Sequence, residues 1–337
     1  MIVEWVREAV RSGGLLLPTH PNDLPTHPVV AMLSGGRDSV CLLDVAVALG
    51  VKGSVTALHV NYGLRGAESD ADERHCAALC ESLGVGLEIV RVSREQGGAG
   101  NLQAWARDVR YAAALRLAEE LDERSAAPGQ RPPALVAAGH TASDQVETIL
   151  YRLAASPGRR ALLGMKAEEG RLVRPLLGVT REQTRAYCEA RGLCWREDES
   201  NDSGAYARVR VRHGLGAALK EVHPAAEANV LRTADLLREE TELLDRLVAD
   251  TLQGSRSIAL ARLEELERAL ARLVVISLVE QAAGTYVPQA GDRVQEILEL
   301  GRRAGSGSGG GLDLHVGGNV SARIEDGRLS MVKLPPR

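Results

Sequence analysis

The order of apolar and polar positions divides the chain into two parts of different character. From Val29 to about residue 154, short uninterrupted apolar runs alternate with longer segments whose apolar residues recur at helical spacing. The pattern predicts strands at 29–33, 55–60, 87–92 and 134–138, and helices near 39–46, 68–83, 102–121 and 143–154. Because strands that are apolar throughout need cover on both faces, this part predicts an α/β fold, a parallel sheet with helices on both faces.

Beyond about residue 215 the alternation stops, and the pattern predicts a helical connector followed by a small α+β domain. Leucines at helical spacing predict one long helix over 225–253, then helices over 260–282 and 291–300. A glycine-serine loop is expected at 305–311, and residues 312–333 alternate through the hairpin signals Gly317-Gly318-Asn319 and Asp326-Gly327.

Three regions are therefore expected along the chain. Residues 1–28 form an N-terminal helix, Ile2 to Val10, and a loop. Residues 29–215 form the α/β domain, and residues 216–337 form the connector and the small domain. Ligands of parallel α/β sheets bind at the carboxyl ends of the strands, so chemistry is sought where the predicted strands end.

Charge changes this picture only locally. The chain of 337 residues has a net charge of −4 and a pI near 6.1, so it is not a basic nucleic-acid binder as a whole. Between Tyr151 and Lys220, however, 14 Lys and Arg stand against 8 Asp and Glu. Such a stretch suits a local phosphate-binding face, and an ion-paired surface explains it equally well.

Cysteine usage and the N-terminus indicate the compartment. The five cysteines are odd in number and include no Cys-x-x-Cys pair, which argues against a disulfide framework or a four-cysteine zinc site. No apolar run near the N-terminus is long enough for a membrane span, and charged residues interrupt any signal-peptide core. We therefore expect a cytoplasmic protein with no membrane partner.

The sequence Ser-Gly-Gly-Arg-Asp-Ser at 34–39 lies between a predicted strand and a predicted helix. The glycines let the backbone approach an anion, and free N–H groups at the helix start can hold phosphate. There is no Gly-Lys-Ser/Thr, so this is not a Walker-type loop. A carboxylate at Asp38 suits a Mg²⁺ ion that bridges it to phosphate, whereas the plainer interpretation is a strand–helix turn. The candidate loop residues are Ser34, Gly35, Gly36, Arg37, Asp38 and Ser39.

A second candidate group follows the fourth predicted strand. Asp144 and Glu147 are three residues apart, hence on one face near the start of a helix. Two carboxylates there can share a Mg²⁺ ion with Asp38 and the phosphates, although helix starts also favour acids for electrostatic reasons alone. His140 can donate to phosphate or move a proton, although a lone His at the end of a strand more often has a structural role.

Six segments carry a family resemblance. The 34–39 string resembles the pyrophosphate loop of the ATP-pyrophosphatase (PP-loop) superfamily. Residues 59–66 (His-Val-Asn-Tyr-Gly-Leu-Arg-Gly), the Ala-Arg-x-x-Arg-Tyr at 106–111 and residues 139–148 (Gly-His-Thr-Ala-Ser-Asp-Gln-Val-Glu-Thr) resemble signatures of tRNA(Ile)-lysidine synthases. Arg-Pro-Leu-Leu at 174–177 and Asp198-x-Ser200-Asn201, followed by Arg208 to Arg212, resemble further stretches of that family. The resemblance is strong over 29–215 and weaker over 216–335.

The resemblance implies a Rossmann-like PP-loop ATPase fold and a two-step ligation. The O2 atom of a wobble cytidine attacks the α-phosphate of ATP, and the amine of free L-lysine then displaces AMP at C2. The implied partners are an isoleucine tRNA with a CAU anticodon and lysine, the implied cofactors are ATP and Mg²⁺, and a homodimer is left open. Residues 29–215 would be catalytic and 216–337 would contact tRNA.

Residue roles follow from the same resemblance. Arg208 and Arg212 are one helical turn apart and would face the reacting group or a tRNA phosphate, whereas an ion-paired helix is the alternative. ATP contacts are expected from the 34–39 loop with His59, Asn61, Gly139 and His140. Catalysis is expected from Asp38, Asp144, Glu147, Arg208 and Arg212, with the three acids binding Mg²⁺. Substrate contacts are expected from Arg107, Arg110, Arg174 and Arg210.

Departures from the family pattern keep two alternatives open. Tyr62 and Thr141 stand where the family has His, Ser143 replaces an Asp, and Val209 replaces an Asn. A non-catalytic RNA-binding relative would explain lost site residues. A tRNA thiolase of the same superfamily would share the loop but needs paired cysteines or an iron–sulfur cluster, and the spacings of Cys76 with Cys80 and of Cys188 with Cys194 suit neither well.

Overall fold

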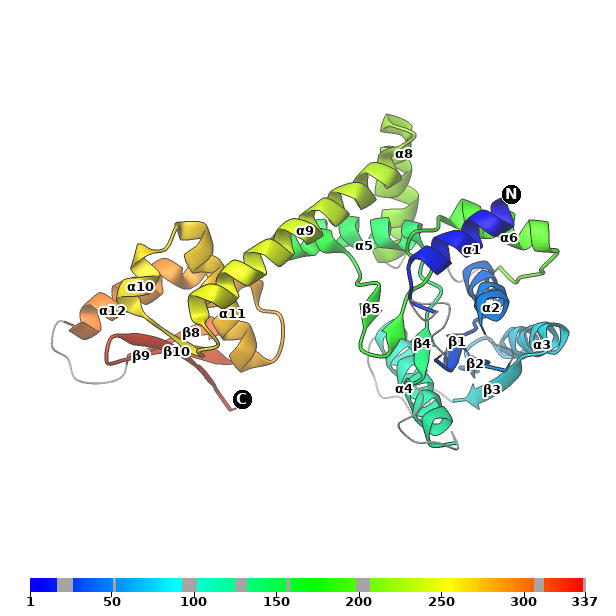
Figure 1. Ribbon diagram of the computed structural model, residues 1–337, viewed down its shortest axis with the longest axis horizontal. Helices are drawn as coiled ribbons and strands as arrows, with labels where there is room; N and C mark the ends of the chain where they lie inside the picture. Colours follow the sequence, from blue (N-terminus) through cyan, green and yellow to red (C-terminus); the bar gives the residue numbers. More distant parts are fainter. Residues whose placement is uncertain are drawn as a thin grey trace. The chain divides into compact units, whose positions relative to one another are not determined.

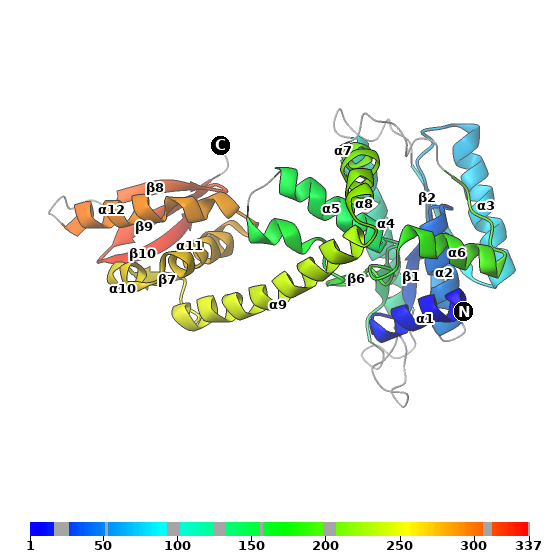
Figure 2. The same ribbon diagram turned by 90° about the horizontal axis from the view of Figure 1, so that it is seen from above.

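The computed structural model describes residues 1–16, 27–50, 53–92, 102–124, 132–155, 158–197, 207–305 and 312–335 (Figures 1 and 2). The chain forms two compact units. The first comprises residues 1–155 and 164–231, and the second comprises 156–163 and 232–337. None of the helices in these described ranges is long and apolar enough to cross a lipid bilayer.

The first unit is built on a six-stranded sheet in the order β3-β2-β1-β4-β6-β5. The four strands predicted from the sequence are β1 (Val29–Met32), β2 (Val55–Asn61), β3 (Gly86–Arg91) and β4 (Leu135–Ala137). They pair in parallel, as does β6 (Leu172–Val173) with β4, so the predicted parallel sheet is confirmed. The antiparallel edge strand β5 (Glu168–Glu169) and β6 were not predicted, because two residues are too few to show a hydrophobic period.

Helices cover both faces of this sheet (Figure 1). They are α1 (Ile2–Ser12), α2 (Arg37–Leu49), α3 (Ala67–Leu83), α4 (Leu102–Glu123), α5 (Ala142–Ala155) and α6 (Arg181–Arg191). Val29 and Ala31 of β1 share a core with α1, α2, α3 and α6. Val30 and Met32 point to the other face and pack with α4. Burial on both faces explains why β1 is apolar at every position.

A run of helices follows α6. It consists of α7 (Ala207–Arg210), a π-helical segment (Val211–Gly216), α8 (Ala217–Val222) and α9 (Ala226–Leu252). The predicted long helix is confirmed as α9, whose 27 residues begin in the first unit and end in the second.

The second unit has an antiparallel sheet in the order β7-β10-β9-β8. Its strands are β7 (Ser257–Ala259), β8 (Leu312–Gly317), β9 (Val320–Glu325) and β10 (Arg328–Lys333). Both predicted hairpin turns are confirmed, and Asn319 and Asp326 adopt the positive φ angles that such turns require. The predicted loop at 305–311 lies outside the described residues except for Gly305, which ends α12.

Helices α10 (Leu260–Glu265), α11 (Arg268–Ala283) and α12 (Val294–Gly305) pack with this sheet around one apolar core, to which a 3₁₀ turn at Pro288–Arg293 contributes Ala290. A second 3₁₀ turn, Arg159–Leu163, also belongs to this unit. The prediction of a single helix over 260–282 was wrong. Leu266 and Glu267 adopt extended ψ angles of 144° and 136° and separate α10 from α11. Neither residue is Gly or Pro, so no helix-breaking signal marks the break in the sequence.

Candidate functional site

The candidate residues gather where the order of strands reverses. Strands β1 and β4 are neighbours in the sheet although β2 and β3 lie between them in sequence. Helix α2 follows β1 and α5 follows β4, so both helices begin at the carboxyl edge of this pair. Such a switch point is where open α/β sheets bind ligands.

The loop from Ser34 to Ser39 is held in shape by its own hydroxyl groups. The Ser34 N–H donates to Ser39 Oγ at 3.1 Å, and Ser39 Oγ donates to the Gly36 carbonyl at 2.8 Å. Gly35 has a φ of 84°, which favours glycine, and Gly36 is the N-cap of α2. Since no side chain among the described residues caps α2, the N–H groups of its first turn are available to an anion.

The end of β4 lies directly against this loop. A Cβ atom placed on Gly139 would be 3.1 Å from the Asp38 carbonyl oxygen and 3.2 Å from the Ser39 nitrogen. A side chain there would require the Asp38 backbone to shift by a few tenths of an ångström, so glycine favours this close approach of the second motif to the first.

The three candidate carboxylates converge on one guanidinium, that of Arg181. Its Nη2 lies 2.5 Å from Asp144 Oδ1, its Nη1 lies 2.5 Å from Glu147 Oε1, and its Nε lies 3.8 Å from Asp38 Oδ2. The structure thus brings together the three acids that the sequence placed on two helices, Asp38 on one and Asp144 and Glu147 on the other, and it adds a cation that was not predicted.

Electrostatics hold Arg181 in its charged form. Burial alone would lower the pKa of this guanidinium, but the charges of Asp144, Glu147 and Asp38 outweigh burial and raise it. Its side chain is 19% exposed, so the interaction is only partly screened by solvent. Arg181 is the first residue of α6, where the helix dipole disfavours a cation, so the carboxylates are what keep it there.

Two of the departures from the family pattern are part of this arrangement. The Thr141 N–H and hydroxyl donate to Asp144 Oδ2 at 2.8 and 2.9 Å, which orients that carboxylate at the start of α5. Ser143 Oγ accepts from the Arg181 N–H at 3.3 Å. Thr184 of α6, a residue not predicted, donates to Asp38 Oδ1 at 2.5 Å. The altered residues therefore contact the carboxylate group and Arg181 directly.

Of the two candidate arginines near 210, Arg212 reaches the same group. Its Nε donates to Glu147 Oε1 at 2.8 Å. Arg208 belongs to α7, but its side chain lies outside the described residues, as do Asp198, Ser200 and Asn201. Val209, where the family has Asn, is buried.

The residues that end β2 differ in what they can offer a ligand. His59 is buried, its Nδ1 lies 2.9 Å from the Leu33 carbonyl, and its Nε2 has no hydrogen-bond partner within the described ranges. A carbonyl partner makes Nδ1 the donor, so Nε2 of the neutral ring is an acceptor. Asn61 instead donates to Glu73 Oε2 and Asp70 Oδ1 and accepts from the Gly63 N–H, which anchors β2 to α3. His140 is half-buried at the end of β4.

The candidate substrate arginines divide by exposure. Arg107 is exposed on α4, and Arg110 is half-buried; their guanidinium carbons lie 4.6 and 5.7 Å from the centre of the Tyr111 ring. Arg210 is exposed on α7. Arg174 is 3% exposed and is held by the Lys166 carbonyl and Glu169, so the prediction that it contacts tRNA does not fit its position. It braces the β5–β6 hairpin instead.

The basic stretch 151–220 is mostly ion-paired in the structure. The paired residues are Arg160, Arg171, Arg174, Arg181, Arg185, Arg191, Arg196, Arg212 and Lys220. The charge count allowed either a phosphate-binding face or an ion-paired surface in this stretch. The structure favours the ion-paired surface for most of these residues.

The donor set fits a hard cation. Carboxylate oxygens are the ligands that Mg²⁺ prefers, and three of them already surround one positive group. As they stand, no three His, Cys, Asp or Glu side chains in the described part of the chain lie close enough to hold a metal, because Arg181 takes that place. A metal at these acids requires the guanidinium to move.

The cysteines give no support to sulfur chemistry. Cys41, Cys76, Cys80 and Cys188 are buried, and Cys194 is exposed. Burial raises the pKa of Cys76 to about 12 and of Cys80 to about 11, and hydrogen bonding to Cys188 raises that of Cys41. These thiols stay protonated near neutral pH and are poor nucleophiles.

Comparison with known proteins agrees with this geometry. A family model described as a PP-loop domain matches residues 17–219. The tRNA(Ile)-lysidine synthase of Geobacter sulfurreducens is 35% identical over 298 residues, covering 82% of this chain and 59% of that protein. The enzyme of the same name from Thermus thermophilus is 34% identical over 323 residues, covering 93% of this chain and 58% of that protein. The chain thus spans about three fifths of the length of these curated relatives.

Among solved structures, the U34-tRNA thiolase NcsA from Methanococcus maripaludis superposes with a TM-score of 0.55 at 17% identity. The superposition covers 70% of this chain and 79% of that one and speaks for a shared fold alone. With its loop at the switch point, its parallel sheet and the match over residues 17–219, this chain belongs to the PP-loop domain family.

Proposed function

We propose that this chain uses ATP and Mg²⁺ to ligate free L-lysine to C2 of the wobble cytidine of an isoleucine tRNA with a CAU anticodon. The observation that carries the proposal is that the phosphate loop, three carboxylates and two arginines lie together at the β1–β4 switch point. Sequence similarity to tRNA(Ile)-lysidine synthases over most of the chain supports the choice of reaction.

The first step forms the adenylated base. Cytidine O2 attacks the α-phosphorus of ATP, and the bond to pyrophosphate breaks. The N–H groups at the start of α2 hold the leaving phosphates, and Gly139 keeps the opposite wall close. The acceptor nitrogen of His59 faces the nucleotide in this proposal. Bound Mg²⁺ would neutralise phosphate charge, with Asp38, Asp144 and Glu147 as its protein ligands.

In the second step the lysine amine attacks C2 and AMP leaves. We assign Arg212, already on Glu147, to the charge that develops on the departing phosphate, and Arg208 to the same task.

The tRNA contacts are assigned to exposed arginines of the first unit and to the second unit. Arg107 on α4 and Arg210 on α7 are exposed, and Arg110 on α4 is half-buried. We propose a cytoplasmic location, where ATP, free lysine and tRNA are all present.

The test measures radiolabelled lysine entering an isoleucine tRNA with a CAU anticodon, together with AMP release. Wild-type protein should incorporate lysine, and Asp38→Ala should lose incorporation by at least about a hundredfold. Glu8→Ala, which removes an exposed acid of α1 that has no assigned role, is the matched control and should stay near wild type. ATP cleavage without lysine entry would contradict the proposed second substrate, and no cleavage at all would refute the reaction.

A further inference from the structure

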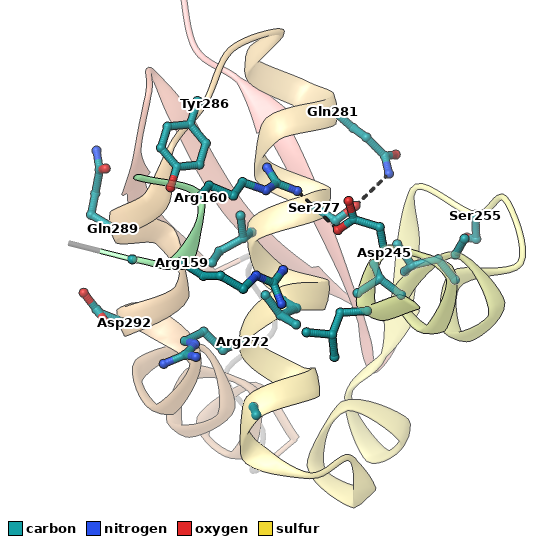
Figure 3. Close-up of a pocket in the computed structure, with 18 of the residues that line it drawn as sticks. Arg159, Arg160, Asp245, Ser255, Arg272, Ser277, Gln281, Tyr286, Gln289 and Asp292 are labelled. Carbon is teal, nitrogen blue, oxygen red and sulfur yellow. Dashed lines mark hydrogen bonds and ion pairs between the residues drawn. The ribbon is translucent and has the colours of Figure 1, made fainter. Parts of the chain in front are cut away.

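The second unit contains a cavity that the proposed reaction does not use (Figure 3). Its volume is about 600 Å³, and residues 158–160, the C-terminal half of α9 and α11 enclose it. Val248, Leu252, Leu273 and Ile276 supply an apolar wall. This size and lining are typical of sites for small organic ligands.

One of the three arginines at the cavity is already neutralised. Arg160 Nη1 lies 2.7 Å from Glu280 Oε2, and its Nη2 lies 3.5 Å from Asp245 Oδ1. Its guanidinium carbon lies 5.8 Å from the centre of the Tyr286 ring. Arg160 therefore fixes the wall and has little charge left to offer a ligand.

Arg159 and Arg272 differ from Arg160. Neither forms an ion pair with any residue of the described ranges, and Arg159 Nε is buried there without a hydrogen-bond partner. Burial lowers the pKa of Arg159; Asp245 opposes that shift, while Arg160 and Arg272 add to it. A buried donor without a partner, close to a second positive charge, is costly until an anion satisfies both.

We propose that this cavity binds the phosphate group of a nucleotide between Arg159 and Arg272. Guanidinium forks match phosphate oxygens in pairs, and two of them match a doubly charged phosphate monoester. The half-exposed ring of Tyr286 provides a face for a base, and the apolar wall accommodates the rest of the nucleoside. The phosphate belongs either to a free nucleotide or to the phosphorylated end of an RNA strand.

The test uses the full chain and isothermal titration calorimetry with two probes. One is AMP, and the other is a short single-stranded RNA with and without a 5′-phosphate. Since AMP also fits the phosphate loop of the first unit, two classes of site are expected. Arg159→Gln and Arg272→Gln should each weaken one class about tenfold and leave the other unchanged. Arg246→Gln, which removes an exposed arginine of α9 outside the cavity, is the matched control.

The two probes distinguish the sources. Weaker AMP binding in both cavity variants assigns the site to a free nucleotide. Weaker binding only of the 5′-phosphorylated RNA assigns it to an RNA end. The proposal is overturned if both variants bind both probes as Arg246→Gln does, or if wild-type protein shows neither a second class of site for AMP nor a preference for the 5′-phosphorylated RNA. Thermal unfolding of each variant verifies that it folds, and either variant alone suffices for the test.

Discussion

Helix α2 carries two aspartates, Asp38 and Asp44, that both bind arginines of α6 but in opposite settings. Asp38 lies in the first turn, with a side chain 22% exposed, beside Arg181 at the β1–β4 switch point. Asp44 lies in the middle of the helix with a side chain 3% exposed. It accepts from Tyr187 at 2.6 Å and from Arg191 Nε at 3.0 Å, and Arg7 of α1 approaches to 3.8 Å.

The same pairing of aspartate with arginine therefore has a different role at the start of α2 than in the middle of the helix. The Asp44 group is closed: its oxygens are taken up by α1 and α6, and it fastens the N-terminal helix to the first unit. The Arg181 group stands at the carboxyl edge of the sheet, where three acids share one cation and ligand charge can enter. A closed group contributes to stability, and an open one is available for chemistry.

The largest expected effect comes from breaking the closed group. Asp44→Ala leaves Arg191 and Arg7 without their buried partner, and we expect the free energy of unfolding to fall by about 3–5 kcal/mol. Urea unfolding followed by circular dichroism measures this. Asp38→Ala should cost far less stability while abolishing activity. Equal loss of stability in the two variants would break the distinction.

A middle-sized effect should come from the open group. Arg181→Gln leaves three acids without their shared cation, and we expect a loss of about 1–3 kcal/mol that millimolar Mg²⁺ restores. Melting temperature measured with and without Mg²⁺ tests this. Arg191→Gln, on the same helix, is the control and should lose stability that Mg²⁺ does not recover. If Mg²⁺ raised the melting temperature of both variants equally, the Arg181 group would be no more open to a cation than the Asp44 group.

The smallest effect concerns pH and belongs to the closed group alone. Burial and the hydrogen bond to Asp44 raise the pKa of Tyr187 above its ordinary value near 10. The protonated phenol therefore stabilises the fold fully below about pH 10, and that contribution is lost as the pH rises further, by about 1.4 kcal/mol per unit. Urea midpoints at pH 8 and pH 11 should show Tyr187→Phe less stable than wild type at pH 8, with a smaller gap at pH 11. A gap that stays constant would contradict this assignment.

The sequence predicted those features that a local pattern records. The strands of the first sheet followed from apolar runs, because residues such as Val29 and Val30 are buried on opposite faces. The phosphate loop and the acids at 144 and 147 followed from motifs at strand ends. The break at Leu266 and the two-residue strands β5 and β6 did not, because only tertiary contacts create them.

Arg181 escaped prediction for a different reason. Its partners lie 34 and 37 positions away in sequence, on another helix. A signal was nevertheless present: the capping pair Thr180 and Gln183 marks a helix start, and an arginine directly after such a cap opposes the helix dipole. A cation in that position indicates a specific anionic partner elsewhere in the fold.

Gly139 has a consequence beyond its own position. Because a single methyl group there would meet the backbone of Asp38 at 3.1 Å, the distance between the two halves of the site is set by backbone touching backbone. Side chains such as Thr141 and Ser143 lie around this contact without forming it, so exchanging them need not move the two backbone segments apart. The site thus tolerates variation in its lining because its width does not depend on side chains.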